Sequence, residues 1–122
     1  MTCSTAQFRV MFGGKNLYVG NAIADAMFSS RGDCQIQRLP LKLHEAVEIL
    51  QTHPFTSCVG HASTASLYTE LLGLPIEANR VSVSLDFGDA ILVGAYNGPR
   101  LPEGCTTLPE GATLGWVVYV VI

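Results

Sequence analysis

The chain has 122 residues, which is the size of one compact domain. Hydrophobic residues make up 48% of it and charged residues 14%, so the chain can bury a sizeable core and lacks the composition of a disordered protein. The net charge is −3, and the 7 lysines and arginines provide no broad basic face for a nucleic-acid duplex, so we expect no DNA partner.

The cysteines and the apolar segments indicate in which cellular environment the protein is expected. Cys3, Cys34, Cys58 and Cys105 are scattered without CxxC spacing, which argues against a zinc site or a disulfide framework and favours free thiols in a reducing cytoplasm. No apolar run approaches the length of a membrane span, and the N-terminus lacks a signal-peptide pattern, so we expect no membrane contact. The low charge of so small a chain also suggests an apolar surface covered by a partner, for which a homodimer is the simplest arrangement.

The first half of the chain alternates short strands with helices. Residues 1–15 form an extension of ambiguous structure, in which the alternation over Phe8–Phe12 is typical of a half-exposed strand. Strands are then expected over Asn16–Gly20, Cys34–Leu39 and Thr56–Val59. Helical segments are expected at Ala22–Phe28 and Leu43–Leu50. In the second of these helices, Leu43, Val47 and Leu50 share one face.

The second half contains a helix and the most apolar strands. The helix begins after His61 and stops at Gly73, and the strictly alternating residues Arg80–Leu85 predict an amphipathic strand. A continuous apolar run over Ala90–Tyr96 predicts a central strand covered on both faces. After a loop rich in proline and glycine, Trp116–Ile122 predicts the last strand. Over residues 16–122, we therefore expect a single α/β (α+β) domain with a mixed β-sheet of about five strands flanked by helices.

The corner between the strand at Thr56–Val59 and the following helix is the best candidate for a functional site. Gly60 provides a tight turn without a side chain that would block a ligand. His61 follows it at the start of the helix, and the backbone N–H groups of the first helical turn have no partners within the helix. Such a turn favours an anion, most often a phosphate. A titratable imidazole beside a phosphate-binding turn is suited to phosphoryl chemistry.

Structural roles remain open for the same residues. His61 could simply cap a strand end, and Ser63 and Thr64 could be ordinary helix caps. His44 and His53 are expected at the surface, and their spacing with His61 matches no metal-binding signature. The sequence therefore predicts no metal site and no cofactor.

Polar residues elsewhere have the same two interpretations. Asn21 is either a turn residue or, if its strand neighbours the one before Gly60, a residue at a ligand-binding sheet edge. Arg100 and Glu103 form either an exposed i, i+3 ion pair or part of a mobile flap that brings a guanidinium to a phosphate. Arg80 is most simply a solvated strand end.

Six short motifs follow one another along the chain: LYVGNA (17–22), VGHAST (59–64), LLG (71–73), NRVSV (79–83), GDAILV (88–93) and RLPEG (100–104). In this order they resemble the viral anti-CRISPR ring nucleases of type III systems. That family was long known only as a domain of unknown function of archaeal viruses, and it has bacterial and phage relatives. The resemblance covers roughly residues 16–122 and is poor over residues 106–114.

The resemblance implies a fold, a ligand and a reaction. The family folds as a mixed sheet flanked by helices and forms a homodimer with a ligand cleft across its two-fold axis. The implied substrate is cyclic tetra-adenylate, the second messenger of type III CRISPR systems. The implied reaction needs no metal: a ribose 2′-hydroxyl attacks the adjacent phosphorus, and linear di-adenylates with 2′,3′-cyclic phosphate ends are released. Loss of the messenger silences the effector nucleases that depend on it.

The resemblance also implies roles for individual residues. His61 matches the catalytic histidine, a general acid for the departing 5′-oxygen. Arg100 and Glu103 match a catalytic pair on a loop that closes over the ligand. Asn21 matches a residue that contacts the ligand, and Ala24 stands where a viral relative has a serine, so that one hydrogen bond to the substrate is lost. The remaining implied substrate-binding positions are Gly60, Ser63, Thr64 and Arg80.

Three functions remain distinguishable by experiment. The first is a ring nuclease, and the second is a dimer that binds and sequesters a cyclic oligonucleotide without cleaving it. The third is a structural or adaptor dimer without a nucleotide site. Cleavage of cyclic tetra-adenylate in EDTA, retention of the intact ring, and absence of binding are the respective outcomes.

Overall fold

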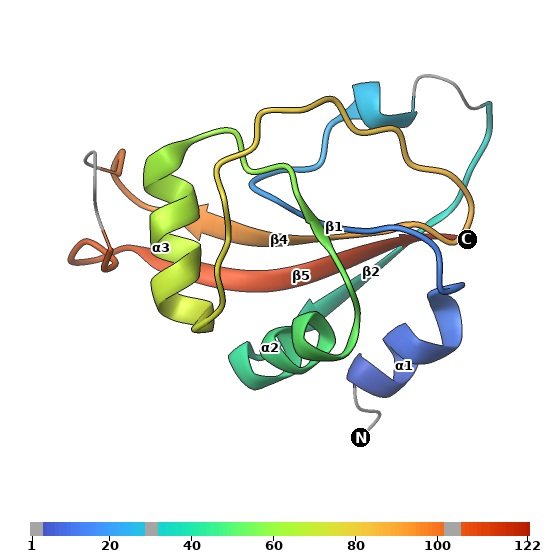
Figure 1. Ribbon diagram of the computed structural model, residues 1–122, viewed down its shortest axis with the longest axis horizontal. Coiled ribbons are helices and arrows are strands. Elements are labelled where there is room, and N and C mark those ends of the chain that lie inside the picture. The colour runs from blue at the N-terminus through green and yellow to red at the C-terminus, as the bar shows by residue number, and fades with distance from the viewer. Residues whose placement is uncertain (1–3, 29–31, 102–105) are drawn as a thin grey trace.

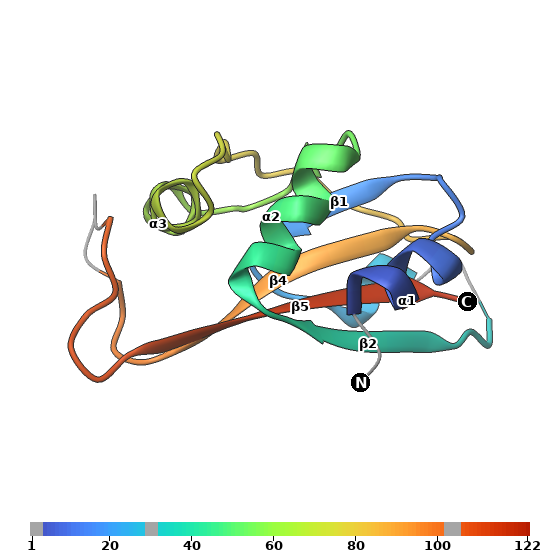
Figure 2. The same cartoon turned by 90° about the horizontal axis from the view of Figure 1, so that it is seen from below.

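In the computed structural model, which describes residues 4–28, 32–101 and 106–122, a five-stranded sheet carries three helices on one face (Figures 1 and 2). The order of the strands is β2-β5-β4-β1-β3. The strands are β1 (Leu17–Gly20), β2 (Ile36–Leu41), β3 (Thr56–Ser57), β4 (Ala90–Asn97) and β5 (Thr113–Val121). β1 is parallel to both β3 and β4, whereas β5 is antiparallel to β4 and β2. The expectation of an α/β domain with a mixed five-stranded sheet is confirmed.

β4 lies at the centre of the sheet, as its apolar run predicts. It pairs with β1 on one side and, over its whole length from Ala90 to Asn97, with β5 on the other. Residues 90–94 are buried, because the helices cover one face and irregular chain covers the other. Figure 2 shows that the chain that follows β4 and precedes β5 reaches past helix α3.

The helical face holds the larger hydrophobic core. Helices α1 (Ser4–Met11), α2 (Leu43–Thr52) and α3 (Ala62–Leu72) all contribute buried side chains to it. In α2 the buried apolar residues are Ala46, Ile49 and Leu50, whereas Leu43 is 46% exposed. The prediction that Leu43 belongs to the buried face of this helix is therefore wrong. Leu43 is the first residue of α2, and the buried face begins further along the helix.

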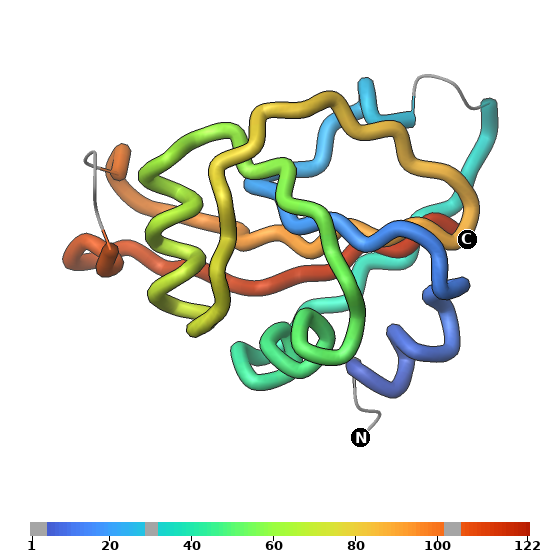
Figure 3. The backbone as a smooth tube through the Cα atoms, viewed as in Figure 1, coloured from blue at the N-terminus to red at the C-terminus, as the bar shows by residue number. Residues whose placement is uncertain are grey.

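The opposite face is covered without a layer of helices. Its core includes Leu85 with residues of β4 and β5, and a short 3₁₀ helix, η1 (Asp25–Phe28), packs there. Arg80–Leu85 is not a strand, which corrects the expectation from its alternation. Val83 and Leu85 of this segment pack on the sheet face, so alternate side chains face the sheet although the backbone does not pair with a strand. In Figure 3 the segment runs beside η1. The amide of Leu85 bonds to the carbonyl of Met27 instead of to a strand.

Residues Ser4–Met11 are helical, so the strand-like interpretation of Phe8–Phe12 is wrong. Phe8 and Phe12 are four residues apart and therefore lie on one side of the helical turn, where their rings stack with centroids 4.9 Å apart. Phe8 is completely buried, whereas Val10, on the other side, is 86% exposed. The apolar spacing that matters here is four and not two.

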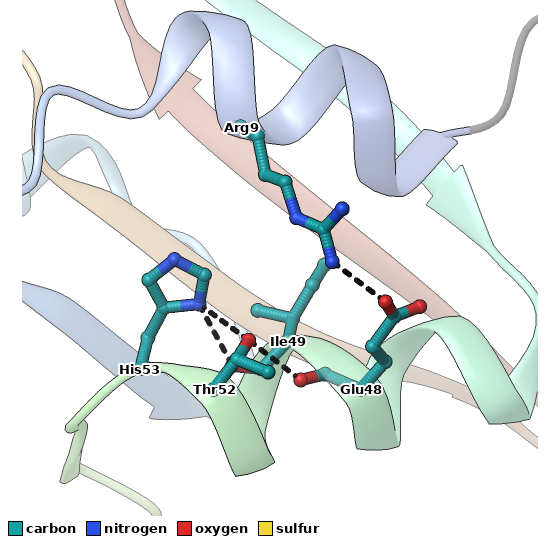
Figure 4. Close-up of polar contacts among 5 residues, drawn as sticks. All are labelled: Arg9, Glu48, Ile49, Thr52 and His53. Atoms are coloured by element: carbon teal, nitrogen blue, oxygen red, sulfur yellow. Dashed lines mark hydrogen bonds and ion pairs between the residues drawn. The ribbon is translucent and has the colours of Figure 1, made fainter.

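Polar contacts join α1 to α2 (Figure 4). An Arg9 guanidinium nitrogen lies 2.6 Å from Oε1 of Glu48. The ring of His53 packs edge-on against Phe8 of α1 and against Phe12, which follows the helix. Its Nδ1 lies 3.0 Å from the carbonyl oxygen of Ile49. His53 is therefore half-buried and not at the surface as expected, whereas His44 is exposed.

Candidate active site

The carboxyl ends of β1 and β3 meet at one edge of the sheet, because the two strands are parallel neighbours. Asn21 follows β1, and Gly60 and His61 follow the chain beyond β3. The backbone N–H of Gly60 lies 3.4 Å from Oδ1 of Asn21 and donates a hydrogen bond to it. The strand before Asn21 is therefore a neighbour of the strand before Gly60, as the ligand-binding interpretation of Asn21 requires.

His61 is the residue immediately before α3, with extended backbone angles (φ −128°, ψ 131°). Its carbonyl accepts the hydrogen bond of Ala65 N–H, but its side chain makes no capping bond to the helix. The side chain is exposed, so the imidazole can reach a ligand through either nitrogen. The backbone N–H groups of Ala62, Ser63 and Thr64 in the first turn need partners from outside the helix.

A cleft with a volume of about 800 Å³ lies between the start of α3 and the chain that follows β4. Its lining residues are His61, Ala62, Ser63, Thr64, Tyr96, Gly98, Arg100 and Leu101. The cleft thus brings together an imidazole, a helix N-terminus and an exposed guanidinium from segments far apart in the sequence. No acidic side chain is among the lining residues that the structure describes, so the described walls suit an anion.

A buried tyrosine fixes α3 against β4 and so sets one wall of the cleft. The Tyr68 hydroxyl accepts a hydrogen bond from Gly94 N–H at 2.9 Å, and it lies 3.1 Å and 3.2 Å from the carbonyl oxygens of Gly94 and Gly20. A Cβ on Gly94 would lie 2.7 Å from this hydroxyl, so only glycine permits the contact. Burial raises the pKa of Tyr68 to about 12, although the hydrogen bond to the Gly94 backbone opposes the shift.

Two further candidate residues lie beside Gly60 without lining the described cleft. Asn21 accepts the hydrogen bond from Gly60 N–H described above. The aliphatic part of the Arg80 side chain lies next to Gly60, since a Cβ built on Gly60 would be 3.8 Å from Cγ of Arg80. Arg80 is exposed, and it follows the bridge between Val59 and Ala78 and not a strand end.

Ala24 is not among the residues that line this cleft. Ala24 lines a separate hollow of about 810 Å³, together with Phe28, Arg38 and Tyr119 among others. Glu103 lies outside the described residues. Tyr96 and Leu101 line the cleft but were not singled out from the sequence, where the only signal was their nearness to Arg100.

The described part of the chain has neither a metal-binding cluster nor a helix suited to a membrane. No group of three or more His, Cys, Asp or Glu side chains in the described residues is arranged to hold a metal ion. None of the described helices has both the length and the apolarity needed to cross a bilayer. Cys34 and Cys58 are free thiols, and burial raises the pKa of Cys58.

Comparison of the chain with known proteins finds a family and two viral relatives. A family model described as STIV B116-like matches residues 17–112, from the first residue of β1 to the residue before β5. Uncharacterized protein ORF117 of Acidianus two-tailed virus is 30% identical over 109 residues, which are 86% of this chain and 91% of that protein. Uncharacterized protein 26 of Sulfolobus islandicus filamentous virus (isolate Iceland/Hveragerdi) is 34% identical over 82 residues, which are 66% of this chain and 69% of that protein.

A solved structure shares the fold. B116 of Sulfolobus turreted icosahedral virus superposes with a TM-score of 0.73 at 21% sequence identity, covering 87% of this chain and 99% of that one. At this identity the match concerns the fold alone. The names of these relatives state no activity, and α1 lies outside the family match.

Proposed function

This chain belongs to the STIV B116-like family, and on that premise we propose that it is a metal-independent ring nuclease that cleaves cyclic tetra-adenylate. The proposal combines the resemblance of six ordered motifs with the chemistry available in the cleft. In this role the protein would remove the second messenger of type III CRISPR systems in the cytoplasm. The alternative is a dimer that sequesters the same ligand intact.

The observation that supports catalysis most directly is the meeting of His61 and Arg100 in one cleft. Both side chains are exposed, and the first turn of α3, whose backbone N–H groups have no partner within the helix, lines the same cleft. A phosphodiester placed in this cleft would meet a proton donor, a cation and backbone N–H groups for its oxygens.

The reaction balances with groups of the ligand and this one imidazole. The ribose 2′-oxygen attacks the adjacent phosphorus, and its proton passes to solvent as the new P–O bond forms. The bond from phosphorus to the 5′-oxygen breaks, and protonated His61 gives its proton to that oxygen. Arg100 neutralises charge on the phosphate in the transition state, and Glu103 orients its neighbours. The ligand carries its own nucleophile, so alignment is the main task of the protein.

A homodimer fits this ligand. Cyclic tetra-adenylate has two-fold symmetry, and a two-fold dimer would present two copies of His61 to opposite phosphates. Two cleavages then release two linear di-adenylates, each with a 5′-hydroxyl and a 2′,3′-cyclic phosphate. Asn21, Ser63, Thr64 and Arg80 are proposed to contact the ring near these phosphates.

Incubation of the full chain with cyclic tetra-adenylate in excess EDTA tests the proposal. We expect linear di-adenylates from the wild type, and a turnover lower by about 10²–10⁴-fold for His61→Ala with binding retained. His44→Ala is the matched control, because His44 is an exposed histidine on α2 away from the cleft. Retention of the intact ring by the wild type would support sequestration, and absence of binding in calorimetry would support a structural role. Wild-type turnover by His61→Ala would remove the histidine from the mechanism.

A further inference from the structure

We propose that Tyr96 is a positioning residue for Arg100: its hydroxyl fixes the peptide before Arg100 and so sets where the guanidinium stands in the cleft. The inference rests on the proposed function, because it concerns how Arg100 meets a phosphate. It adds a residue to which neither the sequence motifs nor the family match assigns a role.

The contact is short and lies at the wall of the cleft. Tyr96 is the last residue but one of β4, it is half-buried, and it lines the cleft with Arg100. Its hydroxyl donates a hydrogen bond to the carbonyl oxygen of Pro99 at 2.5 Å. That carbonyl and the N–H of Arg100 belong to one planar peptide unit, so the bond fixes the orientation of the whole unit.

The turn between the two residues is restricted at each step. A Cβ on Gly98 would lie 2.5 Å from Cβ of Ala112 and 3.0 Å from the Tyr96 hydroxyl, so a larger residue would push the turn away. Pro99 has a fixed φ and no N–H to compete for the hydroxyl. The backbone before Arg100 is therefore restricted by strand β4, by the close contact at Gly98, by the ring of Pro99 and by the hydrogen bond from Tyr96.

Such restriction matters because Arg100 itself is exposed and has many rotamers. A cation contributes most to a transition state when it is already in place and needs no reorganisation during the reaction. Loss of the hydroxyl would free the Pro99–Arg100 peptide while leaving the positive charge in the cleft. The rate of cleavage should then fall, whereas the affinity for the intact ring should change little.

The experiment compares single-turnover cleavage and ring affinity for four variants of the full chain. Tyr96→Phe should cleave about tenfold more slowly, the effect of losing one hydrogen bond, with a dissociation constant for cyclic tetra-adenylate within about twofold of the wild type. Tyr18→Phe, the same change on β1 outside the cleft, should match the wild type. Arg100→Ala should be slow, and adding Tyr96→Phe to it should have no further effect, because the hydroxyl acts through the arginine.

Different outcomes test the role of Tyr96 and the nuclease activity on which it rests. Wild-type rates for Tyr96→Phe, an equal loss with and without Arg100, or a change confined to affinity would each overturn the role of Tyr96. Absence of cleavage by the wild type would overturn the nuclease itself. If Tyr96→Phe does not fold, Pro99→Ala loosens the same peptide from its other side and should also lower the rate without lowering affinity; an unchanged rate there would overturn the inference.

Discussion

The Tyr68→Phe variant removes one oxygen from the contact that holds α3 against the sheet. The side chain is 1% exposed, and its hydroxyl accepts the N–H of Gly94 at 2.9 Å. Without the oxygen, that N–H loses its partner in a site from which water is excluded. An orphaned buried donor costs about 1–3 kcal/mol, so we expect the free energy of unfolding to fall by about that amount.

Urea denaturation measures this change directly. The midpoint should fall while the dependence on urea stays the same, because the variant buries the same surface. In thermal unfolding, the same loss corresponds to a Tm lower by about 4–12 °C for a chain of this size. Tyr18→Phe serves as the control, since the structure gives no hydrogen bond from that hydroxyl to a described residue, and it should change stability by less than about 0.5 kcal/mol. Equal losses for the two variants would refute the assignment of a structural hydrogen bond to Tyr68.

The remaining predictions concern the same contact and the N-terminal helix. Because burial raises the pKa of Tyr68 from 10.0 to about 12, the unfolded chain loses this proton first; the stability that Tyr68 contributes is complete below pH 10 and falls toward pH 12. The difference in the free energy of unfolding between the wild type and Tyr68→Phe should therefore decrease by on the order of 1–3 kcal/mol between pH 10 and pH 12. Denaturation curves recorded across this pH range measure it, and a constant difference would contradict the raised pKa. Gly94→Ala should lower stability by about 1–3 kcal/mol in thermal unfolding, since its Cβ would lie 2.7 Å from the Tyr68 hydroxyl. Gly115→Ala, on the neighbouring strand with nothing within 4 Å of its Cβ, should be close to neutral, and a similar loss for both would exclude the steric explanation. Phe8→Ala should destabilise by about 3–5 kcal/mol because Phe8 is fully buried, whereas Arg9→Ala should cost only about 0–1 kcal/mol because its ion pair is solvated. The reverse order in urea denaturation would show that α1 is held by charge.

The sequence predicts the elements whose pattern has one physical explanation. A continuous apolar run such as Ala90–Tyr96 needs cover on both faces, and β4 is indeed the central strand. α3 ends where Gly73 adopts a left-handed conformation (φ 70°), as a glycine after an apolar stripe indicates. The position of His61 between strand and helix follows from the same local signals.

Other features depend on contacts that no local pattern contains. The alternation of Arg80–Leu85 indicates one buried side but does not distinguish a strand paired in the sheet from irregular chain packed on its face. Phe8 and Phe12 fit both periods, and the helix forms because α2 offers a partner surface at a spacing of four. The sequence could not predict a role for Tyr96, because that role depends on a turn that brings the carbonyl of Pro99 onto the Tyr96 hydroxyl.

The long hairpin of β4 and β5 has a practical consequence for measuring ligand capture. β5 begins at Thr113 beside the cleft end of β4 and runs for nine residues, so its far end is about 26 Å away. α1 and the end of β5 both lie away from α3 in the two ribbon views (Figures 1 and 2). A fluorophore or surface tether joined after Ile122, which is 43% exposed, would leave the mouth of the cleft clear, so binding of the proposed ligand can be tested on immobilised protein in real time.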